Sequence, residues 1–140
     1  MEITANALQT VSANQNVLFT ETPVCGKNCS IIHKEGSGII TLRGITNQCR
    51  ARYKVNFGAN IAIPTGGTVE AISIAISVEG EPIGYTTMTV TPAAVENFFN
   101  IHSAVYIDIP RGCCSQITVE NLNDQAILVQ NANLIVERIA

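Results

Sequence analysis

The amino-acid sequence predicts an all-β fold, an antiparallel jelly-roll sandwich of about ten strands. Apolar residues recur at every second position in several segments, which is the period of a strand with one buried face. Turn residues interrupt these segments about every 8 to 12 positions, and the prolines lie at predicted strand ends or in turns. No long helix is predicted. The 140 residues suit one domain, which can bury a core without disulfide or metal staples.

The elements can be assigned in chain order. Residues 1–15 are polar with scattered apolar positions, so we expect an extended arm that leads into a jelly-roll domain of residues 16–140. Pro23 ends the first strand. Residues 91–96 carry the one helical signal, because the capping residue Thr91 precedes a proline at the first helical position. The predicted strands are 16–22, 31–33, 39–43, 51–63, 69–78, 83–90, 99–109, 116–120, 126–130 and 133–139.

The strands at 51–63 and 69–78 are separated by Pro-Thr-Gly-Gly, so we expect them to form the central hairpin of the fold. The second strand has large aliphatic residues on one face and small residues on the other. Small side chains let another layer approach closely, and that layer is either a neighbouring subunit or the second sheet. The small residues are Ala71, Ser73, Ala75 and Ser77, and their expected partners in a subunit interface are Phe99, Leu134 and Val136.

The last strand contains three consecutive apolar residues, Leu134, Ile135 and Val136, so we expect it to be buried on both faces.

The charge content is low, because only 14% of the residues are charged and the formal net charge is −3. This charge and the lack of a basic cluster argue against a nucleic-acid partner. No apolar run has the roughly 18 to 20 residues that cross a bilayer, so no membrane span is predicted. Sparse charge on a domain of this size favours a homo-oligomer, and a neutral monomer is the alternative.

Residues 1–16 lack the basic and apolar regions of a secretory signal. We therefore expect synthesis in the cytoplasm and a final place on a virion, a spore or an extracellular assembly.

Five cysteines lie in turn-like segments, and structural free cysteines are more often buried. This placement favours disulfides, with an odd thiol left over or bonded to a neighbouring copy. The alternatives are free thiols or a zinc site, in which Cys25, Cys29 and His33 are joined by Cys49 or by the pair Cys113 and Cys114.

The candidates for catalysis are few, since the chain has two histidines and two aspartates. His102 and Asp108 lie six residues apart on one predicted strand, which places them about 20 Å from each other. Ser37 lies in a Gly-Ser-Gly turn without the flanking pattern of a nucleophile elbow. We therefore predict no catalytic residue and no cofactor.

The order of several segments resembles a known family. They are NVLFT (16–20), GSGIITL (36–42), ARYKVNF (51–57), SIAISVEGEPIG (73–84), DIP (108–110) and NANLIVERIA (131–140). This order is similar to the jelly rolls of tumour necrosis factor and the complement globular heads. It is similar in particular to the C-terminal domains of bacterial collagen-like spore-surface glycoproteins and to small phage and clostridial proteins. The resemblance implies a compact trimer with the last strand near the three-fold axis.

Two functions fit these observations. The first is a non-enzymatic, self-assembling structural protein of a particle or cell surface, such as a phage decoration protein or a spore-layer protein. The second is a trimeric head domain that binds a glycan or a receptor. An aromatic platform in the loops would favour this second function. The chain has no tryptophan, and Tyr53, Tyr85 and Tyr106 fall in predicted strands, so the sequence favours the structural function.

Overall fold

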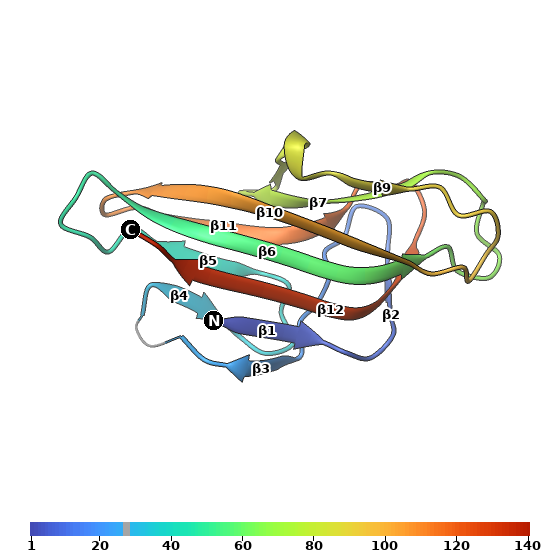
Figure 1. Cartoon of the computed structure of the whole chain (residues 1–140), viewed down its shortest axis with the longest axis horizontal. Helices are drawn as coiled ribbons and strands as arrows, with labels where there is room; N and C mark the ends of the chain where they lie inside the picture. Colours follow the sequence, from blue (N-terminus) through green and yellow to red (C-terminus); the bar gives the residue numbers. More distant parts are fainter. Residues whose placement is uncertain (27–28) are drawn as a thin grey trace.

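Two antiparallel sheets face each other in the computed structural model, which describes residues 1–26 and 29–140 (Figure 1). Sheet A has the order β10 (Phe99–Pro110), β6 (Arg50–Ala62), β12 (Ile127–Arg138), β1 (Glu2–Ala5) and β3 (Glu21–Val24), and β2 (Gln9–Val11) also pairs with β12. Sheet B has the order β4 (Ile31–His33), β5 (Ile40–Arg43), β11 (Cys114–Asn121), β7 (Ile72–Val78) and β8 (Glu81–Pro82), and β9 (Met88–Val90) also pairs with β7. This arrangement confirms the predicted all-β jelly-roll sandwich.

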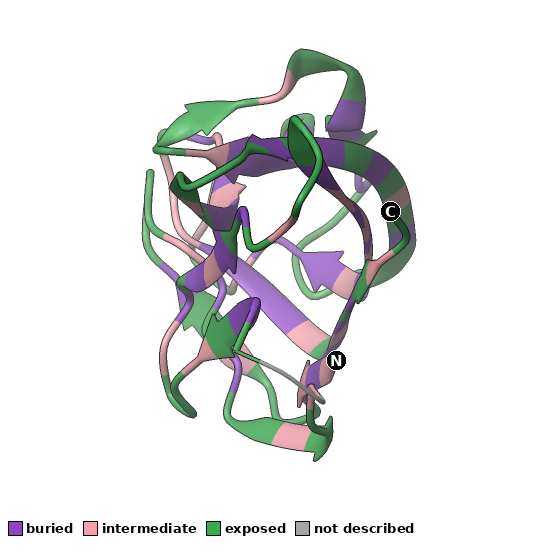
Figure 2. Cartoon of the chain, turned by 90° about the vertical axis from the view of Figure 1, so that its left-hand side faces the viewer, coloured by how far each residue is buried: buried purple, intermediate pink, exposed green. Residues whose placement is uncertain are grey.

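The core fills the space between the two sheets, where buried segments of both sheets meet (Figure 2). The alternation in β6 places Tyr53, Val55 and Phe57 inward, and each is fully buried. Phe57 packs edge-to-face against Phe19 with ring centroids 6.3 Å apart. The buried Tyr53 hydroxyl donates to the Arg43 carbonyl at 2.6 Å, so the polar end of this core residue is satisfied.

The prediction of a central hairpin is wrong. β6 lies in sheet A between β10 and β12, whereas β7 lies in sheet B next to β11. Residues 63–71 therefore cross from one sheet to the other instead of forming a tight turn. Both strands have the alternation of a half-buried strand, and this period does not distinguish pairing within a sheet from packing across the core.

The expected N-terminal arm is part of sheet A. Residues 2–5 form β1, which pairs with β12 and β3, and Ile3 and Ala5 are buried. The first predicted strand, at residues 16–22, is displaced toward the C-terminus. The structure has β3 at Glu21–Val24 instead, and Pro23 lies inside this strand and does not end it. Pro23 is tolerated because β3 is an edge strand of its sheet.

Two other predicted elements differ from the structure. Residues 91–96 contain a bend and a turn instead of a helix, and the Glu96 amide donates to the Ile63 carbonyl at 2.7 Å. The predicted strand 83–90 is interrupted by the short 3-10 helix η1 (Gly84–Thr86). The Thr86 hydroxyl, 3.0 Å from the amide of Ile76, holds η1 against β7.

The last two predicted strands are one continuous strand, β12, with an irregular register between Gln130 and Asn133. Asn131 adopts a left-handed conformation there, with φ of 56°. The expectation that β12 is buried on both faces is wrong for this chain, since Ile135 is 36% exposed while its neighbours on either side face the core.

Candidate assembly surface

The small face of β7 points away from the core, because Ile72, Ile74 and Ile76 point into it. Ala71 is exposed and Ser73 is half-buried, but Ala75 and Ser77 are fully buried within the single chain. The Glu120 side chain lies beside these two residues, since Glu120 pairs with Ala75 and accepts a hydrogen bond from Ser77 Oγ at 3.4 Å. The prediction that Ala75 and Ser77 form a subunit interface is therefore wrong.

The predicted apolar partners of that interface lie in two different environments. Leu134 is 1% exposed and Val136 is fully buried, and both side chains belong to the core between the sheets. Their assignment to an interface is wrong, because the parity of β12 turns them inward. Phe99 is 38% exposed at the start of β10 and remains accessible.

The outer face of sheet A is crossed by a ladder of four asparagine side chains. Asn100 Nδ2 donates to Asn60 Oδ1 at 3.1 Å, and Asn60 Nδ2 donates to Asn131 Oδ1 at 3.1 Å. Asn131 Nδ2 then donates to Asn6 Oδ1 at 2.6 Å. The ladder joins β10, β6 and β12 to the turn after β1. These amides therefore satisfy one another across the sheet.

The rest of this surface has mainly short or uncharged side chains. Ala104, Asn56 and Ile135 form one row across β10, β6 and β12, and His102, Gly58 and Asn133 form the next row. Tyr106 is 60% exposed on the same face. We call this surface the amide face, made of Asn56, Gly58, Asn60, Asn100, His102, Ala104, Tyr106, Asn131, Asn133 and Ile135.

Charged residues border the amide face. Lys54 and Glu137 share a row with Tyr106, and the Glu2 carboxylate accepts from Asn133 Nδ2 at 2.6 Å.

Asp108, also at the border of the amide face, is paired with two arginines. Arg52 donates to both oxygens of Asp108, through Nε at 2.7 Å and Nη2 at 3.0 Å, and Arg50 Nε lies 3.0 Å from Oδ2. The hydrogen bonds from Arg52 lower the pKa of Asp108, and the same contact raises the pKa of Arg52. Asp108 is therefore bound by two cations and is not placed as a catalytic base.

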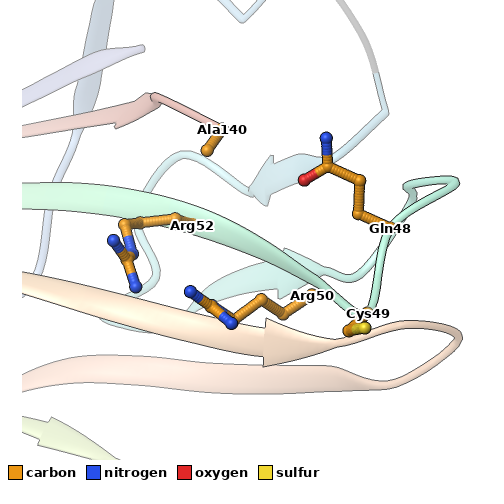
Figure 3. A pocket seen from close by; sticks show the side chains of 5 residues that line it. All are labelled: Gln48, Cys49, Arg50, Arg52 and Ala140. Carbon is orange, nitrogen blue, oxygen red and sulfur yellow. The ribbon is translucent and has the colours of Figure 1, made fainter.

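Arg50 and Arg52 project from the same side of β6 into a small pocket, which Gln48, Cys49 and Ala140 also line (Figure 3). Its volume is about 170 Å³. Ligand pockets usually have about 300 to 1,000 Å³, so this pocket is too small for a typical organic ligand.

All five cysteines are exposed and free in the structure. The segments that carry them converge at one end of the sandwich. The amide of Arg111 donates to the Cys49 carbonyl at 2.9 Å, and the amide of Gly44 donates to the Cys113 carbonyl at 2.8 Å. Arg43 Nη1 lies 3.4 Å from the Cys29 carbonyl. Residues 27–28, inside the predicted loop between the first two cysteines, lie outside the described residues.

The predicted zinc ligands do not come together. The His33 ring packs against Phe19 with centroids 6.3 Å apart, and its Nε2 lies 2.8 Å from the Ser37 carbonyl. The thiols of Cys25 and Cys29 are exposed instead. Within residues 1–26 and 29–140, no group of three His, Cys, Asp or Glu side chains could hold a metal ion. The zinc site formed by Cys25, Cys29 and His33 is therefore wrong for this chain.

One exposed aromatic residue was missed. Tyr85 lies in η1 instead of a strand and is 82% exposed, because the 3-10 turn carries it away from sheet B. The described part of the chain also contains no helix with the length and apolar character to span a bilayer.

No protein-family model matches the sequence, and no curated protein matches it. Among solved structures, the globular domain of the zebrafish complement 1qA protein has a TM-score of 0.62 at 11% identity, covering 96% of this chain and 93% of that one. Murine APRIL has a TM-score of 0.56 at 14% identity, covering 95% and 96%. A family 35 carbohydrate binding module from Clostridium thermocellum reaches only 0.38 at 12% identity, covering 96% and 98%.

The first two similarities extend over nearly the whole of both chains and agree with the resemblance seen in the sequence. Their identities are low, so they concern the fold. The third similarity is too weak to support an argument. The chain therefore has the jelly-roll fold of the tumour necrosis factor and C1q globular heads.

Proposed function

We propose that this protein is a non-enzymatic structural protein that assembles on a particle or cell surface, such as a phage head, a spore layer or an extracellular assembly. In this proposal three copies pack through the amide face. The observation that carries the proposal is the character of that face. It lies on three long strands, and its residues are mostly short amides, glycine, alanine and a partly exposed isoleucine, with the exposed rings of His102 and Tyr106 among them.

The asparagine ladder makes this face suitable for burial. A polar group that loses water without gaining a partner costs about 1 to 3 kcal/mol. Asn60, Asn100 and Asn131 already bond one another, so a neighbouring copy can cover them with fewer such losses. Gly58 contributes no side chain in the middle of β6, and the His102 ring lies beside it, 3.7 Å from where a Cβ would stand. The resemblance to a trimeric family supports three as the number of copies.

The arrangement of titratable groups supports a non-enzymatic function. His33 lies against Phe19, His102 is on the opposite, outer side of sheet A, and Asp108 is bound by Arg50 and Arg52. Catalysis needs a nucleophile, a base and a charge stabiliser that converge on one point. These groups do not converge.

The test is the replacement Ala104→Glu. Ala104 is exposed in the middle of the amide face, so the folded single chain should tolerate the carboxylate while the packed copies should not. Sedimentation velocity at micromolar concentration should give a three-chain species for the wild type and a folded monomer for the variant. Thr87→Glu, an exposed site beyond η1 on the other sheet, is the control and should remain a trimer. A variant that stays trimeric, or a monomeric wild type, would refute the proposal.

We also propose that at least one disulfide cross-links the end of the sandwich that carries the cysteines. This bond would join the Cys25 and Cys29 region to Cys49 or to the pair Cys113 and Cys114. The convergence of these segments supports the pairing. A bridge of this kind stabilises by about 3 to 4 kcal/mol, mainly by restricting the unfolded chain.

A second function, glycan or receptor binding by the trimer, is favoured by one observation. Tyr85 is 82% exposed on η1 and could stack on a sugar ring. A glycan array with selective, saturable binding that Tyr85→Ala abolishes would support this function over the structural one. A wild-type protein that binds no glycan on the array would exclude glycan binding as the function.

A further inference from the structure

The two ends of the sandwich differ in charge. All five arginines of the chain lie at the end where β6 and β11 begin and where β5, β10 and β12 finish (Figure 1). Hydrogen bonds tie the segments together, since the amide of Gly112 donates to the Gly44 carbonyl at 3.0 Å and the amide of Arg52 donates to the Ala140 carbonyl at 3.2 Å. We call this end the arginine end, made of Arg43, Arg50, Arg52, Arg111 and Arg138.

The arginine end retains positive charge. Asp108 pairs with Arg50 and Arg52, and Glu137 is the other carboxylate in the strands that finish there. Among the described residues, no Asp or Glu carboxylate lies within 4.0 Å of the guanidinium groups of Arg43, Arg111 or Arg138. Arg138 Nε donates to the Ala140 main-chain oxygen at 3.3 Å.

The opposite end is acidic. It is formed by residues 63–71, 91–98 and 122–126, which contain no lysine or arginine. Thr65 Oγ1 donates to Glu96 Oε1 at 2.7 Å, and Gln125 Nε2 donates to Glu70 Oε1 at 3.0 Å, so the three loops are held together. We call it the acidic end, made of the exposed carboxylates Glu70, Glu96 and Asp124.

We propose that the arginine end of one copy docks on the acidic end of the next, so that copies stack end to end. This inference rests on the proposed function, in which the amide face makes the lateral contacts and leaves both ends open. Both surfaces are end faces of the same two-sheet sandwich, and their charges are opposite, as complementary docking surfaces require. A contact between two different surfaces closes into a ring or extends into an open filament, and surfaces at opposite ends of the molecule favour an open column.

A charge exchange tests the proposal. Arg43→Glu with Arg111→Glu makes both ends negative, and Glu70→Lys with Asp124→Lys makes both ends positive. At low ionic strength, light scattering and sedimentation should show columns for the wild type and single trimers for either double variant alone. An equimolar mixture of the two variants should form columns again. At about 1 M salt, where the Debye length is about 3 Å, the wild type should return to single trimers.

The control is Lys34→Glu with Thr87→Glu, a similar change of net charge at exposed positions away from both ends, which should still form columns. Trimers that do not stack at low salt, or a mixture that does not recover stacking, would overturn this inference while the trimer stands. Binding of a polyanion such as heparin to non-stacking trimers would also overturn it. If the wild type is a monomer that forms columns at low salt, and the mixture of the two double variants forms columns again, the trimer is refuted and the stacking is supported.

Discussion

Replacing Ala75 with glutamate should destabilise the folded chain, whereas the same replacement at Ala104 should leave the fold intact. Both residues are alanines in the middle of a strand, and both side chains point away from the core. They differ because Ala75 is fully buried beneath neighbouring side chains and lies opposite Glu120, while Ala104 is exposed and lies opposite Asn56.

The size of the effect at Ala75 follows from this burial. A buried carboxyl avoids ionisation by taking up a proton, which at pH 7 costs about 1.36 kcal/mol for each pH unit above its usual pKa of about 4.3, or about 3.7 kcal/mol. The additional side-chain atoms overpack the site at a cost of about 1 to 3 kcal/mol. The sum of about 5 to 7 kcal/mol is comparable with a total unfolding free energy of about 5 to 15 kcal/mol. Neither cost arises at Ala104.

Thermal melting and sedimentation of the two variants measure the difference. Ala75→Glu should lower the melting temperature by more than about 10 °C, because 1 kcal/mol corresponds to about 2 to 4 °C or more in a domain of this size. The loss should be smaller at pH 5, where protonating the carboxyl costs less. Ala104→Glu should melt close to the value for the isolated wild-type chain. An Ala75→Glu variant that is a stable, soluble monomer would refute this reasoning and restore the small face of β7 as the interface.

Three further outcomes are expected. Asn121→Leu should destabilise by about 3 to 5 kcal/mol in chemical denaturation, because the buried amide bonds the carbonyls of Val11 and Gln125 and accepts from Asn123; an unchanged midpoint would contradict this role. Asp108→Asn should make the unfolding free energy fall less in acid than it does in the wild type. Because the pKa of Asp108 is lowered in the folded chain, its stabilising effect is present above the unfolded pKa near 4 and disappears as the pH falls through the folded pKa. Unfolding free energies of the two proteins that fall in parallel with pH would contradict this assignment. Non-reducing electrophoresis of assembled particles should show a disulfide-shifted band, whereas five alkylatable thiols in every chain would exclude the disulfide.

The alternating pattern was sufficient to predict the class of fold and the positions of the long strands. β6 and β10 have nearly the predicted limits, because each has one apolar face and their pairing buries those faces together. Pairing between distant segments was not predictable, since the alternation of β7 is the same whether it pairs with β6 or packs across the core from it. The irregularity at Asn131 was also not visible, because either side of it has strand periodicity.

The candidate assembly surface could be predicted only in part. The sparse charge predicts an oligomer, and the predicted contact lay on the small residues of β7, two of which are buried within the single chain. Small residues are compatible with a buried site and with an interface, and only the structure shows that Ala75 is already fully buried within the single chain. The amide face had a signal in the sequence, because Asn56, Gly58 and Asn60 fall on alternate positions of one predicted strand. The register of β10 and β12 was needed to align the rows across the sheet.

Hydroxyl-radical footprinting of the native assembly tests the central claim most directly, because two tyrosines report on opposite sheets. Tyr106, on the amide face, is 60% exposed in the single chain, and Tyr85, on η1, is 82% exposed. If copies pack through the amide face, Tyr106 should be protected in the wild-type assembly and modified in the Ala104→Glu variant, while Tyr85 is modified in both. Equal modification of Tyr106 in the two proteins would contradict the claim.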